Sequence, residues 1–120
     1  LCKNIFSKII DLTNVEFINW KVSAYFHIQN SNDRVKNTIH TDNGILYAGL
    51  IYLTPNISES SGTSLYEKKW YGYKVIERFP NRYNSLVMYN ASTYHGPSDF
   101  ADDRLTLPFF IKGLEIGYKV

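Results

Sequence analysis

Three residues of this sequence have the types and spacing of a metal site: His40, Asp42 and His95. His40 and Asp42 are two positions apart, so on a β-strand both side chains would project from the same face. His95, from a later strand, would complete a set of two imidazoles and one carboxylate. This set suits an iron(II) ion that keeps three coordination positions open. The alternative is that His40 is a surface residue and that Asp42 opens a turn with Asn43 and Gly44.

A second pair of residues suits the binding of an anion. Arg104 and Thr106 are also two positions apart, on a stretch whose other face is apolar. An arginine on an inward face needs an anionic partner, because an unpaired buried charge is very costly. A ligand carboxylate held by both arms of the guanidinium would satisfy it. A salt bridge to Asp102, Asp103 or a distant glutamate is the alternative, and Arg104 taken alone favours that alternative.

The composition is that of one ordinary globular domain. The chain has 120 residues, of which 44% are hydrophobic and 20% charged, and its net charge is +2. That length leaves little room for a second core, so residues 1–120 are expected to form a single domain. The scattered basic residues do not indicate a nucleic-acid partner, and no apolar run is long enough to span a membrane. The single cysteine, Cys2, and the absence of a signal-peptide pattern favour a cytoplasmic location.

The elements that must position these residues are mainly strands. Apolar and polar residues alternate from Ile18 to Ile28, which predicts a strand whose polar face carries Tyr25 and His27. His27 is therefore not expected to be a metal ligand. Apolar residues at helical spacing predict a short helix over Lys3 to Leu12. Further strands are predicted over Asn37 to Asp42, Tyr47 to Thr54, Thr63 to Tyr66, Tyr73 to Arg78, Ser85 to Tyr89 and Leu105 to Ile111. About seven or eight short strands joined by turns favour an antiparallel sandwich, barrel or jelly roll.

The combination of His40-x-Asp42, His95, Arg104 and Thr106 resembles the iron- and 2-oxoglutarate-dependent dioxygenase superfamily, in particular its prolyl-hydroxylase-like branch. The resemblance covers most of the chain and includes two softer features, the LIYL run and the SGTSL run that follows it. It implies a mainly all-β fold, a double-stranded β-helix or jelly roll. It also implies that His40, Asp42 and His95 bind iron(II).

The resemblance further implies a reaction and a cosubstrate. The distal carboxylate of 2-oxoglutarate would meet Arg104 and Thr106, and Tyr25 would lie near the cosubstrate, with Tyr47 and Tyr52 as rivals. The implied reaction hydroxylates a substrate with dioxygen while 2-oxoglutarate is decarboxylated to succinate. Related halogenases carry a small residue in place of Asp42, so its presence favours hydroxylation. The prime substrate, a peptide or a small metabolite, is not identified.

Two departures and two alternatives accompany this resemblance. Only about 20 residues precede the first core strand, fewer than is common in the superfamily, and Asn84 stands where a glycine turn is common. A non-catalytic β-sandwich or jelly-roll binding domain would make His40 and His95 incidental. A cupin-like metal protein of another chemistry would usually have more histidines than this chain offers.

Overall fold

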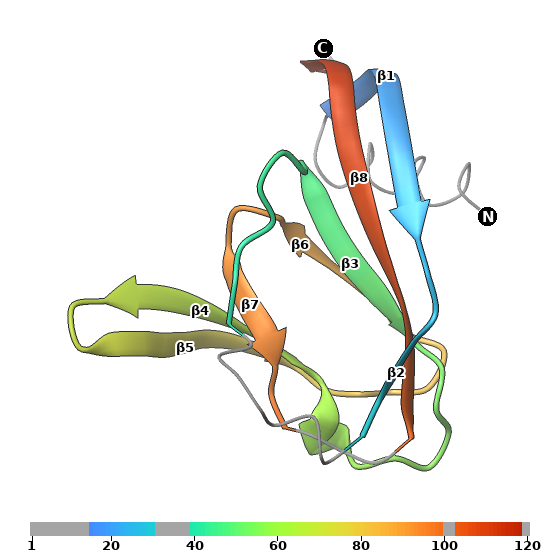
Figure 1. The fold of residues 1–120 in the computed structure, drawn as a ribbon, viewed down its shortest axis with the longest axis vertical. Helices are drawn as coiled ribbons and strands as arrows, with labels where there is room; N and C mark the ends of the chain where they lie inside the picture. The colour runs from blue at the N-terminus through green and yellow to red at the C-terminus, as the bar shows by residue number, and fades with distance from the viewer. Residues whose placement is uncertain (1–14, 31–38, 100–102, 119–120) are drawn as a thin grey trace.

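The chain folds into two antiparallel β-sheets, as seen in a computed structural model that describes residues 15–30, 39–99 and 103–118 (Figure 1). Side chains are described for residues 21–30, 39–99 and 103–113. The described part of the chain contains eight strands and a single 3₁₀ turn, Glu59–Ser61, which lies between the third and fourth strands. The strands are β1 (Val15–Ala24), β2 (His27–Gln29), β3 (Tyr47–Tyr52), β4 (Thr63–Lys69), β5 (Gly72–Phe79), β6 (Leu86–Asn90), β7 (Tyr94–Pro97) and β8 (Arg104–Tyr118). The predicted all-β jelly roll is therefore confirmed. The predicted helix over Lys3 to Leu12 lies outside the described residues.

The larger sheet is built around β8. Its strand order is β1-β8-β3-β6, and β2 pairs with β8 beyond the end of β1. The smaller sheet has the order β5-β4-β7. β8 begins at Arg104 and continues past the predicted end at Ile111, because β1 pairs with it as far as Tyr118. The candidate anion-binding residues, Arg104 and Thr106, therefore lie at the N-terminal end of β8.

The core of the larger sheet packs around three buried side chains, Tyr47, Phe109 and Ile111. Gly49 is required for this packing, since a Cβ atom there would lie 2.4 Å from the Val87 carbonyl oxygen and 2.6 Å from the Phe109 ring. The Phe109 ring thus crosses β3 where that strand has no side chain. No helix in the described part of the chain is long and apolar enough to cross a membrane.

The predicted strand from Ile18 to Ile28 is divided in two. β1 ends at Ala24 and β2 begins at His27, although both pair with β8. At the β2 end the apolar side of this stretch is exposed, with Phe26 72% exposed and Ile28 61% exposed. On the same side of β1, Val22 packs against the core of the larger sheet. The polar side chains of this stretch instead line a cavity between the sheets. The inward face is polar because it lines a site rather than a core.

The predicted strand from Asn37 to Asp42 is not a regular strand. Residues 31–38 are outside the described part of the chain. Among residues 39–42, only His40 makes a β-bridge, with His95. Thr41 and Asp42 belong to no strand, and the turn at Asn43 and Gly44 follows directly. The pairing that places the two candidate ligands is therefore shorter than predicted.

Candidate metal centre and anion pocket

His40 and His95 are held beside each other by the backbone. The His40 N–H donates to the His95 carbonyl oxygen at 3.0 Å, and the His95 N–H donates to the His40 carbonyl oxygen at 3.0 Å. Such a doubly bonded pair places both side chains on the same face, and the ring centroids are 4.5 Å apart. Asp42 is anchored next to them, since its N–H donates to the Ala91 carbonyl oxygen at 2.9 Å.

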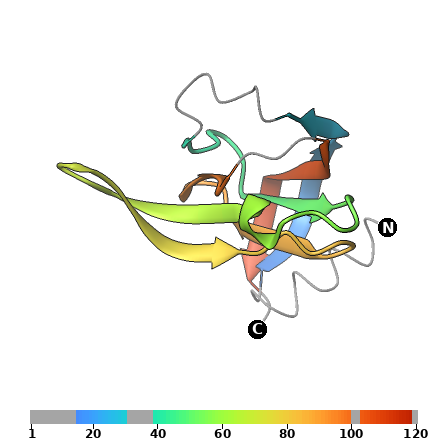
Figure 2. The ribbon, with the colours of Figure 1, turned by 90° about the horizontal axis from the view of Figure 1, so that it is seen from below.

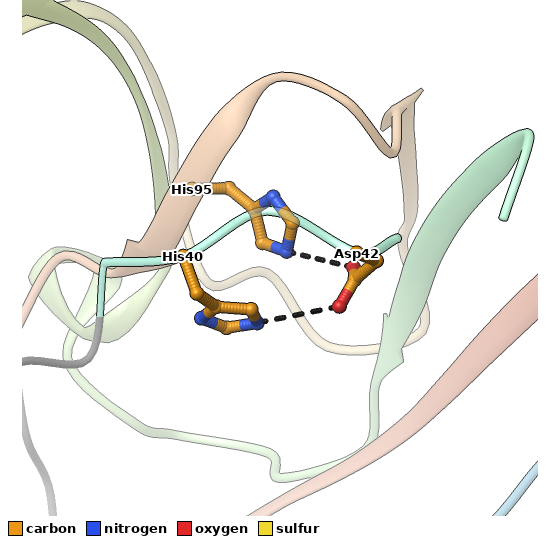
Figure 3. Close-up of side chains that lie close together, drawn as sticks. All are labelled: His40, Asp42 and His95. Atoms are coloured by element: carbon orange, nitrogen blue, oxygen red, sulfur yellow. Dashed lines mark ion pairs between the residues drawn. The ribbon is translucent and has the colours of Figure 1, made fainter. Parts of the chain in front are cut away.

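The three predicted ligands converge on one point (Figure 3). One ligand atom from each of His40, Asp42 and His95 lies within 4.8 Å of the others. Asp42 Oδ1 is 3.6 Å from His40 Nε2, and Asp42 Oδ2 is 3.1 Å from His95 Nε2. Despite that short distance, Asp42 Oδ2 is buried and has no hydrogen-bond partner. Its lone pairs are therefore available to a cation.

The surroundings of His95 favour the form that binds metals. Its Nδ1 lies 2.7 Å from the Thr93 carbonyl oxygen, which can only accept a hydrogen bond, so Nδ1 carries the proton and Nε2 keeps its lone pair. Burial lowers the pKa of His95 below its ordinary value, and the neighbouring His40 acts in the same direction. A neutral imidazole, a second imidazole and an unpartnered carboxylate oxygen together fit a divalent metal ion.

Arg104 is buried without an acidic partner among the described residues. It is 4% exposed, and its Nε donates to the Ser61 carbonyl oxygen at 2.6 Å. Nη2 is 3.5 Å from the Gly62 carbonyl oxygen, and the guanidinium carbon is 5.6 Å from the centre of the Tyr52 ring. Two neutral carbonyls and a ring orient the guanidinium but leave its charge unneutralised. The alternative of a salt bridge to Asp103 is wrong, and Asp102 lies outside the described residues.

One of the two carbonyls that orient Arg104, that of Ser61, is held by Asn81, which the sequence did not single out. The other, that of Gly62, accepts from the Ser98 N–H at 2.9 Å. Asn81 is 2% exposed, and its Nδ2 is 3.2 Å from Ser61 Oγ and 3.4 Å from the Ser61 carbonyl oxygen. A Cβ atom at Gly62 would lie 1.8 Å from the Phe79 carbonyl oxygen, so only glycine allows this close approach. No sequence signal could reveal Asn81, because Pro80-Asn81 is typical of a turn.

The metal centre and Arg104 open into the same cavity, which has a volume of about 160 Å³. Its lining includes five of the six predicted site residues: Tyr25, His40, His95, Arg104 and Thr106. Asp42 is not part of the lining but lies against His95, with Oδ2 3.1 Å from Nε2. Thr106 is 1% exposed and follows Arg104 on the same face of β8. The fold therefore brings the two polar pairs, which are far apart in the sequence, to the same cavity.

Four tyrosines at or near the site lie in different environments. Tyr25 lines the cavity mouth at 52% exposure and stacks on Phe110 with ring centroids 6.1 Å apart. Tyr47 packs in the core of the larger sheet, away from the cavity lining. Tyr52 is fully buried, and its hydroxyl donates to Thr63 Oγ1 at 2.7 Å. Tyr89, which the sequence did not single out, lines the cavity with its ring 4.5 Å from that of His95. Burial raises the pKa of Tyr89, so its hydroxyl stays protonated.

Comparisons with known proteins give a fold-level likeness only. No family model matches the sequence, and no curated protein matches it. Among solved structures, the chain is similar to an RmlC-like cupin protein from a subspecies of Desulfovibrio desulfuricans. The two are 17% identical with a TM-score of 0.38, and the match covers 82% of this chain and 76% of that chain. The strands and their pairing, independently of this likeness, show an all-β jelly-roll fold, and it carries a group of three residues that could hold a metal ion.

Proposed function

We propose that this protein is an Fe(II)- and 2-oxoglutarate-dependent dioxygenase that hydroxylates a peptide or small metabolite. The observation that carries the proposal is the shared cavity of two unlike sites. At one end are two imidazoles and a carboxylate with an unpartnered buried oxygen, and at the other is a buried arginine without an acidic partner among the described residues. A non-catalytic binding domain would need neither feature.

The residues of the chain have separate tasks in this proposal. His40, Asp42 and His95 would hold iron(II) from one side, which leaves the cavity side open to small ligands. Arg104 and Thr106 would bind the distal carboxylate of 2-oxoglutarate with charge-assisted hydrogen bonds. When bound, iron and 2-oxoglutarate would supply, with dioxygen as the oxidant, decarboxylation to succinate and carbon dioxide: one oxygen atom would go to succinate and the other to the hydroxyl group of the product. The chain's part is to orient both groups and to keep Arg104 away from water.

The test of the metal site is anaerobic titration with Fe(II) in the presence of 2-oxoglutarate. A weak visible charge-transfer band should appear for the wild-type protein and should be lost in His40→Ala and in His95→Ala. Lys112→Ala, on an exposed position of β8, is the control and should retain the band. Equal bands in wild type and in both histidine variants would contradict the proposed iron site.

Arg104→Ala tests the cosubstrate end separately. This variant should still bind Fe(II), but its dissociation constant for 2-oxoglutarate should rise by about two orders of magnitude or more. The estimate follows from the loss of two charge-assisted hydrogen bonds worth about 1.5–3 kcal/mol each. Calorimetry with Mn(II) as a stable substitute metal gives the constant without turnover. An unchanged constant would remove Arg104 from the site.

A further inference from the structure

Gln29 is a buried polar residue that has no role in the reaction proposed above. Its side chain lines the cavity, is 6% exposed, and its Oε1 has no hydrogen-bond partner. A buried carbonyl oxygen without a hydrogen bond destabilises the folded state, so such groups are rare in native structures. An unpartnered carboxamide in a cavity wall therefore indicates a ligand that completes its hydrogen bonds.

The register of the larger sheet places Gln29 beside the arginine. In the pairing of β2 with β8, Gln29 is opposite Arg104 and His27 is opposite Thr106. Directly opposed residues project from the same face with Cβ atoms about 4.5–5.5 Å apart. The Gln29 and Arg104 side chains thus leave the sheet from adjacent positions on the face that lines the cavity.

The same register separates Tyr25 from Arg104. The Tyr25 N–H donates to the Pro108 carbonyl oxygen, four residues further along β8 than Arg104. At about 3.3 Å per residue, this is about 13 Å along the strand. Among the polar residues of β2 and the segment before it, Gln29 is therefore the one next to Arg104.

We propose that Gln29 is a specificity-determining residue that binds the distal carboxylate of a five-carbon 2-oxo dicarboxylic acid together with Arg104. This inference rests on the proposed function and adds a residue to it. A carboxamide can turn by 180° about its last torsion with little change in shape, so either its oxygen or its N–H₂ group can face the ligand. The N–H₂ group would donate to the carboxylate. Gln29 thereby selects a dicarboxylate over a monocarboxylate of equal length.

The experiment compares two 2-oxo acids that differ only at the distal end. Binding of 2-oxoglutarate and of 2-oxopentanoate, which has a methyl group in place of the carboxylate, is measured by calorimetry with Mn(II) present. Gln29→Leu should raise the dissociation constant for 2-oxoglutarate by about tenfold or more, as expected for one lost hydrogen bond to a charged group. Its dissociation constant for 2-oxopentanoate should change by less than about twofold.

Two further variants make the result specific. Gln29→Glu keeps the volume and places a carboxylate beside Arg104, so it should weaken 2-oxoglutarate binding more than Gln29→Leu does. Ile28→Thr changes the neighbouring residue on the outer face of β2 and should bind both acids as the wild type does. Equal loss for both acids, or unchanged 2-oxoglutarate binding in both Gln29 variants, would overturn the role of Gln29 while leaving the proposed function intact. Failure of the wild type to bind 2-oxoglutarate would overturn the proposed function and this inference with it.

Discussion

His95 joins the backbone and the side-chain constraints of the site in a single residue. Its main chain forms the bridge with His40, its Nδ1 donates to the Thr93 carbonyl oxygen, and its Nε2 faces Asp42. The ring has no freedom to exchange its tautomer without losing the hydrogen bond to Thr93. The coordinating form of His95 is therefore fixed before any metal binds.

The lowered pKa of His95 predicts how the metal-free protein responds to acid. Burial lowers the folded-state pKa below 6.5, so in the pH range just below 6.5 the unfolded chain binds more protons than the folded one. The stability contributed by neutral His95 is fully present above that pH and is lost as the pH falls through the folded-state pKa. His95→Asn, which can still donate to Thr93, should show a shallower loss of stability between about pH 7 and 5. Urea denaturation in the presence of a chelator measures both curves, and parallel curves would contradict the prediction.

At the scale of the elements, the sequence predicts strands well where apolar residues form a short continuous run. β3 and β6 lie where the Tyr47 to Thr54 and Ser85 to Tyr89 stretches predict them, within a few residues. The alternation from Ile18 to Ile28 separates the two faces of this stretch but does not show that its polar face lines a cavity. Periodicity alone cannot distinguish a polar surface from the polar wall of a cavity.

The candidate site is predictable only as far as local spacing determines it. His40-x-Asp42 and Arg104-x-Thr106 each place two side chains together through strand geometry, and the sequence shows that spacing directly. Gln29 and Asn81 reach the site through pairing with residues 75 and 20 positions away, Arg104 and Ser61. Register between distant strands is a property of the folded chain, so these two residues could not be identified from the sequence.

The loop that leads from the 3₁₀ turn into β4 gives a prediction at the same scale. Gly62→Ala should destabilise the protein by about 3 kcal/mol or more, because the new Cβ atom would overlap the Phe79 carbonyl oxygen. It should also weaken 2-oxoglutarate binding, because the Gly62 carbonyl helps to orient Arg104. Chemical denaturation and calorimetry measure the two effects. Gly72→Ala is the matched control. Its Cβ would meet nothing within 4 Å, so only the backbone strain of its positive φ, about 1–3 kcal/mol, is expected, with unchanged ligand binding.

At the scale of the whole molecule, the outer part of the β4–β5 hairpin projects away from the rest of the chain (Figure 2). β7 pairs with β4 only over Thr63 to Tyr66, so the outer half of the hairpin is paired only within itself. At its tip, Trp70 is 96% exposed and Tyr71 is 63% exposed. The hairpin tip is therefore independent of the packing that holds the candidate site.

Replacement of both tip aromatics should leave the fold nearly unaffected. The double variant Trp70→Ser with Tyr71→Ser should change the free energy of unfolding by no more than about 0.5 kcal/mol, since exposed side chains contribute little. Tyr52→Ala, in contrast, should cost about 3–5 kcal/mol, because Tyr52 is fully buried. Urea denaturation followed by far-UV circular dichroism measures both. A large loss in the tip variant would show that the tip packs against another part of the protein.

The backbone bridge between His40 and His95 has a consequence for metal binding at the candidate site. Because two main-chain hydrogen bonds hold the rings together, the donor set exists before an ion arrives, and His40 is 55% exposed to the ions in solution. Nitrogen and oxygen donors bind copper(II) and zinc(II) more tightly than iron(II), whatever the reaction they serve. A preformed and accessible site of this kind is prone to mismetallation. The metal content of a purified sample would therefore depend on the ions present during expression and purification, and it would not identify the ion that supports the proposed reaction.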